Sequence, residues 1–346
     1  MSRALVISGG GSKGAFAVGV LKRLFATYPG LDFDIFVGTS TGSLMCPLVA
    51  LKEMDMVEAL YTSQKTDDII LKKRIGDSLN DTSIFDGSPL WSQLLRNYTD
   101  QRYQEIIDSG KKIFLTTVCM QSGEMVVFTN HANPAEPRHY SVKTLINADQ
   151  FRKAIMASAS QPVFMQPVKV NLHVPGEPNP YFQFVDGGVR EYAGIQMAID
   201  NGATEIFTIL LSPESDEAEK KEYKNLFSVL ERTISIFTDD VGKNDLIIPK
   251  LFNEGLEYID AVKKKMISKG ISENEVADYF SISGLESPYE NKKPLKLFQF
   301  RPKAPLGGGA GGLNFDQVEM KEMIAKGETS ANEFIAMLQT TDISWA

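Results

Sequence analysis

An apolar segment runs directly into a turn of small residues in FDIFVGTSTG, residues 33–42. Its apolar half, residues 33–37, is typical of a buried strand in a parallel sheet. The leucines between Leu44 and Leu51 then recur at helical spacing, which predicts that a helix follows the turn. The stretch therefore predicts a strand–turn–helix unit, the building block of α/β folds.

The turn itself has the pattern G-x-S-x-G, formed by Gly38, Ser40 and Gly42. Glycine at both flanking positions permits the strained strand-to-helix turn that exposes a serine hydroxyl as a nucleophile. A serine at this place can also serve simply as the N-cap of the following helix. The other motifs of the chain favour the nucleophile interpretation.

A second glycine-rich turn lies near the N-terminus, where the apolar residues 4–8 run into GGGSKG, residues 9–14. A helix is expected to follow and to end at Pro29. The backbone amides of such a loop face an anion, either a pyrophosphate or a developing oxyanion. Dinucleotide binding also requires an acidic residue about 20 positions later, where this chain has the G-x-S-x-G turn instead.

A third turn of small residues follows the apolar segment 182–185 and consists of Asp186, Gly187 and Gly188. The two glycines let the chain turn away and leave the carboxylate at the carboxyl edge of the sheet, where α/β folds place their sites. Because Ser40 also ends a strand, we expect the hydroxyl and the carboxylate to meet at this edge. Without the other motifs, an ordinary Asp-Gly turn explains these residues equally well.

The other segments up to Leu211 alternate between helix and strand patterns. This alternation predicts an α/β sheet with parallel strand pairs. Residues 54–110 are expected to form short helices without strands. The further predicted elements are a hairpin at 113–120 and 124–129, a helix at 142–159, a helix ending near Asn201 and a strand at 205–211.

The chain becomes charged and helical beyond Pro213. Its glycine-rich residues 306–312 are predicted to be a flexible connector, because no strand-to-helix unit with a Lys-Ser/Thr ending surrounds them, as a phosphate loop requires. The elements predicted in this region are helices at 217–237 and 242–269, a strand at 295–300 and terminal helices after Asn314.

A serine nucleophile needs a base. The usual α/β-hydrolase order is serine, acid, histidine, but no histidine follows Asp186. The histidines are His131, His139 and His173, which lie in polar or proline-rich surroundings typical of surface loops. A triad of His173 with an earlier acid stays open, but the pattern favours a dyad of Ser40 and Asp186.

The three motifs GGGSKG, GTSTG and DGG, in this order, resemble the signatures of the patatin-like phospholipase family. The similarity covers about residues 4–211, and ASASQP at residues 157–162 also resembles a family segment that precedes the aspartate. The resemblance implies a three-layer α/β/α fold with a mostly parallel central sheet. Residues 1–212 are then the acyl hydrolase domain, with a helical insertion at about 54–110, and residues 213–346 are a mainly helical C-terminal extension packed on or near the core.

The resemblance also implies a Ser–Asp dyad that hydrolyses phospholipids, lysophospholipids or other acyl esters without a metal or an organic cofactor. By this resemblance Ser40 is the nucleophile and Asp186 the base. The chain departs from the family pattern at VREY, residues 189–192, which leaves the shape of the pocket open. The implied oxyanion hole consists of Gly9, Gly10, Gly11 and Gly14. The implied nucleophile elbow contains Gly38 and Gly42, and the aspartate turn contains Gly187 and Gly188.

A dyad that acts on lipids makes two demands on the fold. An ordinary aspartate has a pKa near 3.9 and is a weak base, so Asp186 must be partly buried. An acyl chain also needs an apolar wall or lid. The candidate for this wall, which can equally be plain core, is the apolar helix face of Leu90, Trp91, Leu94 and Leu95.

Composition and charge exclude several other classes of protein. The 346 residues carry a formal charge of −8, and an acidic chain of this kind is not expected to bind nucleic acid. The two cysteines are too few for a disulfide scaffold or a cysteine-rich zinc site, and they indicate a cytoplasmic protein. No segment is apolar enough for a signal peptide or a membrane span, so membrane contact is expected to be peripheral. The oligomeric state is not predicted.

Two other classes of function stay open at this point. A patatin-like fold without catalysis would bind acyl lipids or a protein partner, although such a module has no chemical need for both Ser40 and Asp186. An NAD-dependent oxidoreductase would use the glycine loop at residues 9–14 to hold a nucleotide.

Overall fold

A computed structural model describes residues 2–73, 81–171, 182–214, 222–282, 284, 289 and 292–338. Its central sheet has the strand order β11-β10-β1-β2-β5-β6-β7, and β9 pairs with β5 and β8 beside this path. The strands are β1 (Arg3–Ile7), β2 (Ile35–Gly38), β5 (Lys112–Cys119), β6 (Met125–Thr129), β7 (Ser141–Thr144), β8 (Val168–Lys169), β9 (Gln183–Asp186), β10 (Glu205–Ile209) and β11 (Lys296–Phe300).

Most pairs in this sheet are parallel. Strands β11, β10, β1, β2 and β5 run in the same direction, and β6 and β7 are parallel to each other. The antiparallel pairs among the described strands of this sheet are β5 with β6, β5 with β9, and β8 with β9. The predicted hairpin is β5 and β6. The α/β class with a mostly parallel sheet is therefore confirmed.

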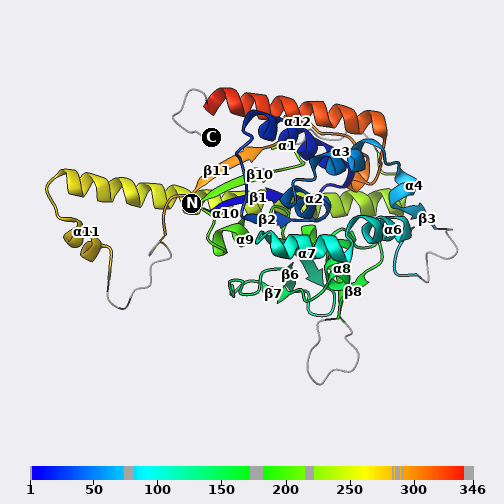
Figure 1. Ribbon diagram of the computed structural model, residues 1–346, viewed down its shortest axis with the longest axis horizontal. Helices are drawn as coiled ribbons and strands as arrows, with labels where there is room; N and C mark the ends of the chain where they lie inside the picture. Colours follow the sequence, from blue (N-terminus) through cyan, green and yellow to red (C-terminus); the bar gives the residue numbers. More distant parts are fainter. Residues whose placement is uncertain are drawn as a thin grey trace, which may run out of the picture.

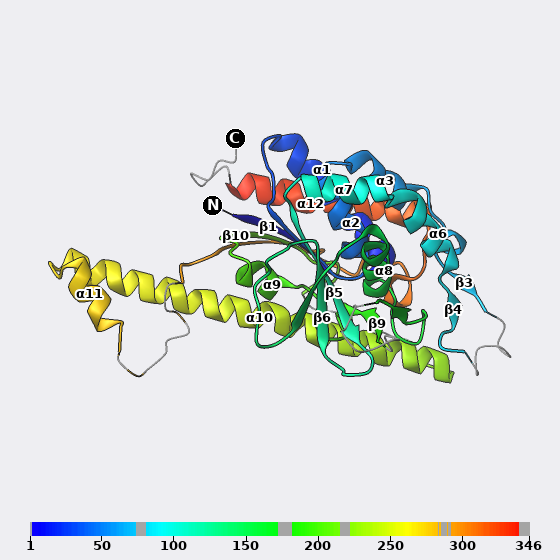
Figure 2. The same cartoon turned by 60° about the horizontal axis from the view of Figure 1, so that its bottom comes forward.

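Helices cover both faces of the sheet. Figure 2 shows α1, α2, α3 and α12 on one side and α9 and α10 on the other. The helices are α1 (Gly14–Thr27), α2 (Thr41–Ala50), α3 (Met54–Thr62), α4 (Thr66–Ile69), α6 (Ser88–Asn97), α7 (Asp100–Asp108), α8 (Ala148–Ser158), α9 (Ile195–Asp200), α10 (Leu226–Ser268), α11 (Glu273–Tyr279) and α12 (Gln317–Leu338), with short 3-10 turns η1 (Gly11–Lys13), η2 (Gly187–Val189) and η3 (Ala310–Gly312).

Strand β1 shows why these helices form two layers. Its residues Leu5 and Ile7 belong to the core under α1 and α12, whereas Ala4 and Val6 belong to the core under α9. All four side chains are fully buried. Because both faces of the strand are covered, its sequence is an uninterrupted apolar run and not an alternating one. The three-layer α/β/α arrangement follows from this double burial.

Helices α1 and α12 pack against each other through glycine. A Cβ atom added at Gly19 would lie 2.0 Å from the carbonyl oxygen of Ile324, and one added at Gly327 would lie 2.0 Å from that of Phe16. The two backbones therefore touch without side chains between them. This contact ties the C-terminal helix to the first helix of the fold (Figure 1).

Helix α10 docks on the segment that follows β9. One carboxylate oxygen of Asp245 accepts hydrogen bonds from the amides of Tyr192 and Ala193, at 2.5 and 3.2 Å. Glu191 lies next to this carboxylate. Burial and, to a smaller extent, the negative charge of Asp245 together raise the pKa of Glu191 to about 8. Since the two amides favour the charged form of Asp245, Glu191 is the member of the pair that keeps its proton at neutral pH.

Four secondary-structure predictions differ from the structure. The region 54–110 contains a small antiparallel pair, β3 (Leu71–Lys72) with β4 (Phe85–Asp86). The first residues of the helix predicted at 142–159 form β7, because they pair with β6, and α8 starts only at Ala148. Where terminal helices were predicted after Asn314, the described residues up to Leu338 form one helix, α12.

The fourth difference is α10, one continuous helix of 43 residues where two helical patterns were predicted. Pro249 lies inside it without ending it. Its C-terminal part extends away from the sheet and carries α11 at its end (Figures 1 and 2). The ammonium group of Lys263 lies 4.7 Å from the ring centre of Phe280 and holds the end of α11 against α10. Beyond residue 212, the chain also adds β11 to the central sheet.

The glycine contact between α1 and α12 predicts a reversed substitution effect. Alanine normally stabilises a helix interior relative to glycine by about 1 kcal/mol. At Gly327, however, we expect alanine to lower the free energy of unfolding by about 1–3 kcal/mol, because its methyl group overlaps the backbone of α1. Urea unfolding measures the change. The exposed Lys326→Ala on the same helix is the control, and a stabilised Gly327→Ala variant would contradict the contact.

The raised pKa of Glu191 predicts how the stability of the fold depends on pH. A carboxyl group with a raised pKa in the folded state contributes stability that is fully present below its unfolded pKa and is lost as the pH rises through the folded value. The loss is therefore expected between pH 4.5 and about 8. Glu191→Gln should remove this loss, so its advantage in melting temperature over the wild type should grow from pH 6 to pH 9. The exposed Glu136→Gln is the control, and a constant difference across this range would refute the assignment.

Candidate active site

Ser40 occupies a strained turn between β2 and α2. It is the N-cap of α2, and its backbone angles are φ 55° and ψ −118°. A non-glycine residue with positive φ is uncommon, and such strain is typical of functional sites. The main-chain amide of Ser40 donates a hydrogen bond to the hydroxyl oxygen of Ser158, at 3.1 Å, which helps to hold the turn.

The glycines on either side of Ser40 are required by close packing. A Cβ atom added at Gly42 would lie 2.1 Å from the carbonyl oxygen of Ile7, in β1. One added at Gly38 would lie 2.5 Å from the carbonyl group of Gly42. The turn is thus pressed against the sheet so tightly that neither position has room for a side chain.

Asp186 reaches Ser40 by a route that differs from the expectation. Strand β9 does not run parallel to β2 but is antiparallel to β5, with Asp186 opposite Thr117. On the same edge of β5, the one that β6 leaves free, Gly38 of β2 lies opposite Leu115. Strand β5 is longer than β2 and extends past it, so it offers an edge on which β9 pairs. The last residue of β9 is thereby brought level with the turn after β2.

Thr116 of β5 touches both turns, and the sequence analysis missed it. Its hydroxyl donates a hydrogen bond to the hydroxyl oxygen of Thr39, at 2.8 Å. A Cβ atom at Gly187 would lie 2.3 Å from the same hydroxyl oxygen. No motif in the sequence marks Thr116, because its role comes from the pairing of β5 with two strands.

The Ser40 hydroxyl donates a hydrogen bond to the Asp186 carboxylate. One oxygen of this carboxylate also accepts the amide of Gly188 at 2.8 Å. Asp186 is only 7% exposed. Burial raises its pKa to about 6, although the hydrogen bonds from Ser40 and Gly188 oppose the shift. The expected burial of this carboxylate is therefore present.

The segment ASASQP, residues 157–162, bridges the two turns. Ser158 accepts the amide of Ser40, as described above, and the carbonyl oxygen of Ser160 accepts the amide of Asp186 at 2.8 Å. Two pockets, one apolar and one more polar, meet at Ser40, and Gln161 lines both of them.

The first glycine loop also reaches Ser40. Gly9 and Gly10 line one pocket together with Ser40, and Gly11 lines the other. Gly14 lies apart from these pockets. It starts α1, and a Cβ atom there would lie 2.7 Å from the ring of Tyr61. This contact explains why position 14 has no room for a side chain.

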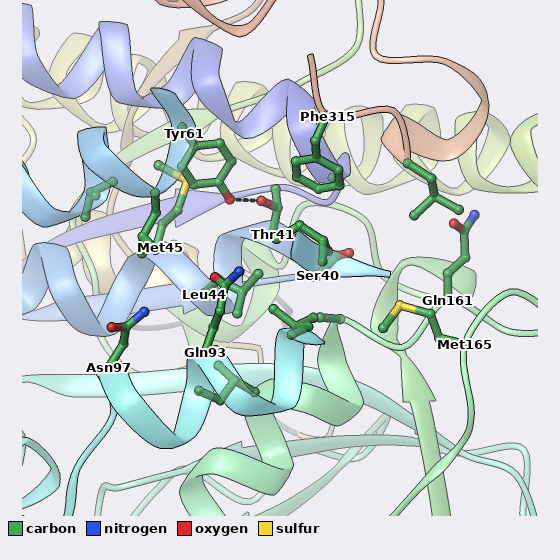
Figure 3. Close-up of a pocket in the computed structure, with 18 of the residues that line it drawn as sticks. Ser40, Thr41, Leu44, Met45, Tyr61, Gln93, Asn97, Gln161, Met165 and Phe315 are labelled. Carbon is green, nitrogen blue, oxygen red and sulfur yellow. Dashed lines mark hydrogen bonds between the residues drawn. The ribbon is translucent and has the colours of Figure 1, made fainter. Parts of the chain in front are cut away.

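One of the two pockets is apolar (Figure 3). Its cavity volume is about 70 Å³. From Ser40 it passes between α2, α3 and α6. The side chains that make it apolar are Leu44, Met45, Leu48, Val57, Leu60, Ile69, Leu90, Leu94, Met165, Leu313 and Phe315.

The predicted wall is thus partly correct. Leu90 and Leu94 line the apolar pocket, whereas Trp91 packs beside the core and Leu95 is exposed. Sequence reasoning missed Tyr61, whose hydroxyl forms a hydrogen bond with Thr41, the residue after Ser40 (Figure 3).

The second pocket is more polar and contains Asp186. Lys13, Ser212, Ser235 and Thr238 contribute polar groups to it. Residues 189–192, where the chain departs from the family pattern, supply Val189 and Tyr192 to its wall. The arrangement can hold an apolar chain on one side of Ser40 and a polar group on the other.

The C-terminal third supplies walls that the sequence analysis did not anticipate. Helix α10 contributes Ile234, Ser235 and Thr238 to the polar pocket. Gly311 lines both pockets, and Leu313 and Phe315 line the apolar one. The sequence signal for this wall is the glycine-rich run 306–312, which composition alone predicts to be a flexible connector.

The histidines do not join this site in the part of the chain that the structure describes. His139 is exposed, His131 is partly buried, and neither lines a pocket at Ser40. His173 lies outside the described residues. The described side chains also contain no cluster of three or more His, Cys, Asp or Glu suited to a metal ion. No described helix is both long and apolar enough to cross a membrane.

Similar proteins exist among curated sequences and solved structures. A protein of Escherichia coli named "cUMP-AMP-activated phospholipase" is 45% identical over 65 residues, which are 17% of this chain and 20% of that protein. This chain therefore matches only a fifth of that relative's length. The crystal structure of VipD from Legionella pneumophila aligns with 97% of this chain and 67% of its own, with a TM-score of 0.45 and 9% identity.

The family model described as "Patatin-like phospholipase" matches residues 5–199. This range contains all three motifs, the strained turn at Ser40 and the buried Asp186. The match covers more than half of the chain, and the chain belongs to the patatin-like phospholipase family.

Proposed function

We propose that this protein is a lipid acyl hydrolase in which Ser40 is the nucleophile and Asp186 the base. The hydrogen bond from the Ser40 hydroxyl to the buried Asp186 carboxylate carries this proposal. It lies where an apolar and a polar pocket meet. Membership of a family of lipid acyl hydrolases supports it as well.

The environment of Asp186 suits a general base. A pKa of about 6 leaves the carboxylate ionised at neutral pH, yet it makes the group a stronger base than an ordinary aspartate. Asp186 accepts the proton of Ser40 as the serine oxygen attacks the acyl carbonyl. It then passes this proton to the leaving alcohol oxygen, and an acyl-enzyme remains on Ser40.

Water completes the cycle. Asp186 takes a proton from the water as the water oxygen attacks the acyl-enzyme, and the proton returns to Ser40 when the fatty acid leaves. Both steps create a negative oxygen that needs hydrogen-bond donors. The amide of Ser40 is already used by Ser158, so we assign this role to the amides of Gly10 and Gly11. Neither of these amides has an acceptor among the described residues.

The two pockets support an acyl ester with a polar leaving group. The acyl chain would occupy the apolar pocket, and a glycerophosphate head or another polar alcohol would occupy the pocket that Lys13 borders. Phospholipids and lysophospholipids both have this polarity, and the E. coli relative is named a phospholipase. Residues 1–212 are the proposed hydrolase domain. A cytoplasmic location with peripheral contact to lipid fits the two buried free cysteines.

Ser40→Ala and Asp186→Asn test the dyad. Each is expected to lower kcat by at least about 10³-fold on an aryl ester and on phospholipid or lysophospholipid dispersions, because the variants lack the nucleophile or the base. Release of fatty acid measures the activity. Ser92→Ala, an exposed serine of α6, is the matched control, and equal melting temperatures show that the variants are folded.

The alternatives give different results in the same assay. Turnover that survives in Ser40→Ala would overturn the dyad. Wild-type protein that binds acyl lipid without releasing fatty acid would favour the non-catalytic binding module. Nicotinamide reduction that is indifferent to Ser40→Ala would favour the oxidoreductase.

The raised pKa of Asp186 predicts the pH dependence of hydrolysis. The protonated carboxyl group cannot accept the serine proton, so kcat/KM should rise with pH and level off above an apparent pKa of about 6. Initial rates on a soluble aryl ester between pH 4.5 and 8 measure this, after subtraction of spontaneous hydrolysis. A rate that is independent of pH between 5 and 7 would contradict the role of Asp186.

A further inference from the structure

The glycine-rich residues 306–312, here called the C-terminal glycine loop, lie against the loop of residues 9–14. A Cβ atom added at Gly312 would lie 2.0 Å from the carbonyl oxygen of Gly10. One added at Gly11 would lie 2.2 Å from the carbonyl oxygen of Gly312. The two loops therefore touch backbone to backbone, and neither glycine can be replaced without moving the other loop.

The path of the C-terminal glycine loop is specific. Five of its glycines have φ between 61° and 90°, a region that other residues seldom adopt. These residues are Gly307, Gly308, Gly309, Gly311 and Gly312. The glycines thus encode one defined course of the backbone, in contrast to the flexible connector that the composition had indicated.

Both ends of this loop are anchored. The amide of Gly308 donates to a carboxylate oxygen of Glu319, in α12, at 3.2 Å, and its carbonyl oxygen accepts the amide of Asn314 at 2.8 Å. Beyond the loop, the amide of Phe315 donates to the hydroxyl oxygen of Thr66, in α4, at 2.9 Å. The loop is held between two helices and is pressed onto residues 10–12.

We propose that the C-terminal glycine loop is a positioning element of the active site, which holds the amides of Gly10 and Gly11 where they stabilise the oxyanion. This inference rests on the hydrolase function proposed above. Within the loop 9–14, the amide of Lys13 donates to the carbonyl oxygen of Gly10 at 3.1 Å, and the amide of Gly14 donates to those of Gly11 and Ser12. These bonds use the carbonyl groups of Gly10 and Gly11 and not their amides. The family match ends at residue 199, so the support from the C-terminal glycine loop comes from outside the matched domain.

The physical reason is the strict geometry of an oxyanion hole. Donors must lie about 2.7–3.1 Å from the negative oxygen, and loss of one donor lowers kcat by about 10²–10³-fold. A shift of about 0.5 Å already weakens such a site. Gly312 lies directly behind the two assigned donors, so a methyl group there displaces them while Ser40 and Asp186 keep their hydrogen bond.

Gly312→Ala tests the inference, with Gly110→Ala as its matched control. The two glycines have φ of 73° and 67°, so alanine causes the same backbone strain at both positions. Only Gly312 has neighbours, because nothing lies within 4 Å of a Cβ atom at Gly110. On a soluble aryl ester we expect Gly312→Ala to lower kcat by about 10–100-fold, with KM changed less than about threefold, and Gly110→Ala to leave both unchanged.

The pH profile separates positioning from general damage. In Gly312→Ala the apparent pKa of about 6 should persist although kcat falls, because the surroundings of Asp186 are unchanged. Equal kcat values for Gly312→Ala and Gly110→Ala, in a protein whose wild type hydrolyses the ester through Ser40, would overturn this inference and leave the hydrolase function intact. A wild-type protein that does not hydrolyse the ester at all would instead overturn the proposed function.

A second variant keeps the test available if Gly312→Ala does not fold. Glu319→Ala removes the acceptor of the Gly308 amide at the partly exposed start of α12 and touches neither pocket. We expect it to lower kcat about 3–10-fold with KM unchanged. An unaltered kcat in folded Glu319→Ala would contradict the positioning role.

Discussion

The pairing of β5 with two strands at once holds the two halves of the site together. Strand β2 aligns Gly38 with Leu115, and β9 aligns Asp186 with Thr117, so the two turns reach the same level of the sheet. Sheet pairing sets positions along a strand by backbone hydrogen bonds, which leave little freedom to slip. Thr116, between these two positions, contacts the residue before Ser40 and the residue after Asp186. The serine and the carboxylate therefore meet on a rigid frame.

A rigid frame makes the strain at Ser40 tolerable. Glycines at 38 and 42 remove the side chains that would push the turn off the sheet, and Ser158 fixes the amide of Ser40. The same crowding excludes water from Asp186 and raises its pKa. Tight packing thus produces both the exposed hydroxyl and the basic carboxylate that the proposed chemistry uses.

The region beyond residue 212 supplies part of the walls of both pockets at Ser40. Helix α10 closes the polar pocket and is tied through Asp245 to the segment after β9. The C-terminal glycine loop closes both pockets and backs the first glycine loop. Strand β11 adds to the same sheet, and α12 packs on α1. These contacts explain why a segment with no recognisable motif lines a site whose motifs all lie before residue 199.

The sequence by itself determined the α/β class, the three turns and their small residues, because strand and turn chemistry is local and each motif lies within a few consecutive residues. It also pointed to Ser40 and Asp186 as partners. Only the tertiary structure decided that β9 is antiparallel to β5, that Thr116 joins the two turns, and that residues 306–312 pack on Gly10 and Gly11. These are contacts between segments far apart in the chain. No local pattern encodes such contacts, because they depend on which strand edge and which helix surface are left to be covered.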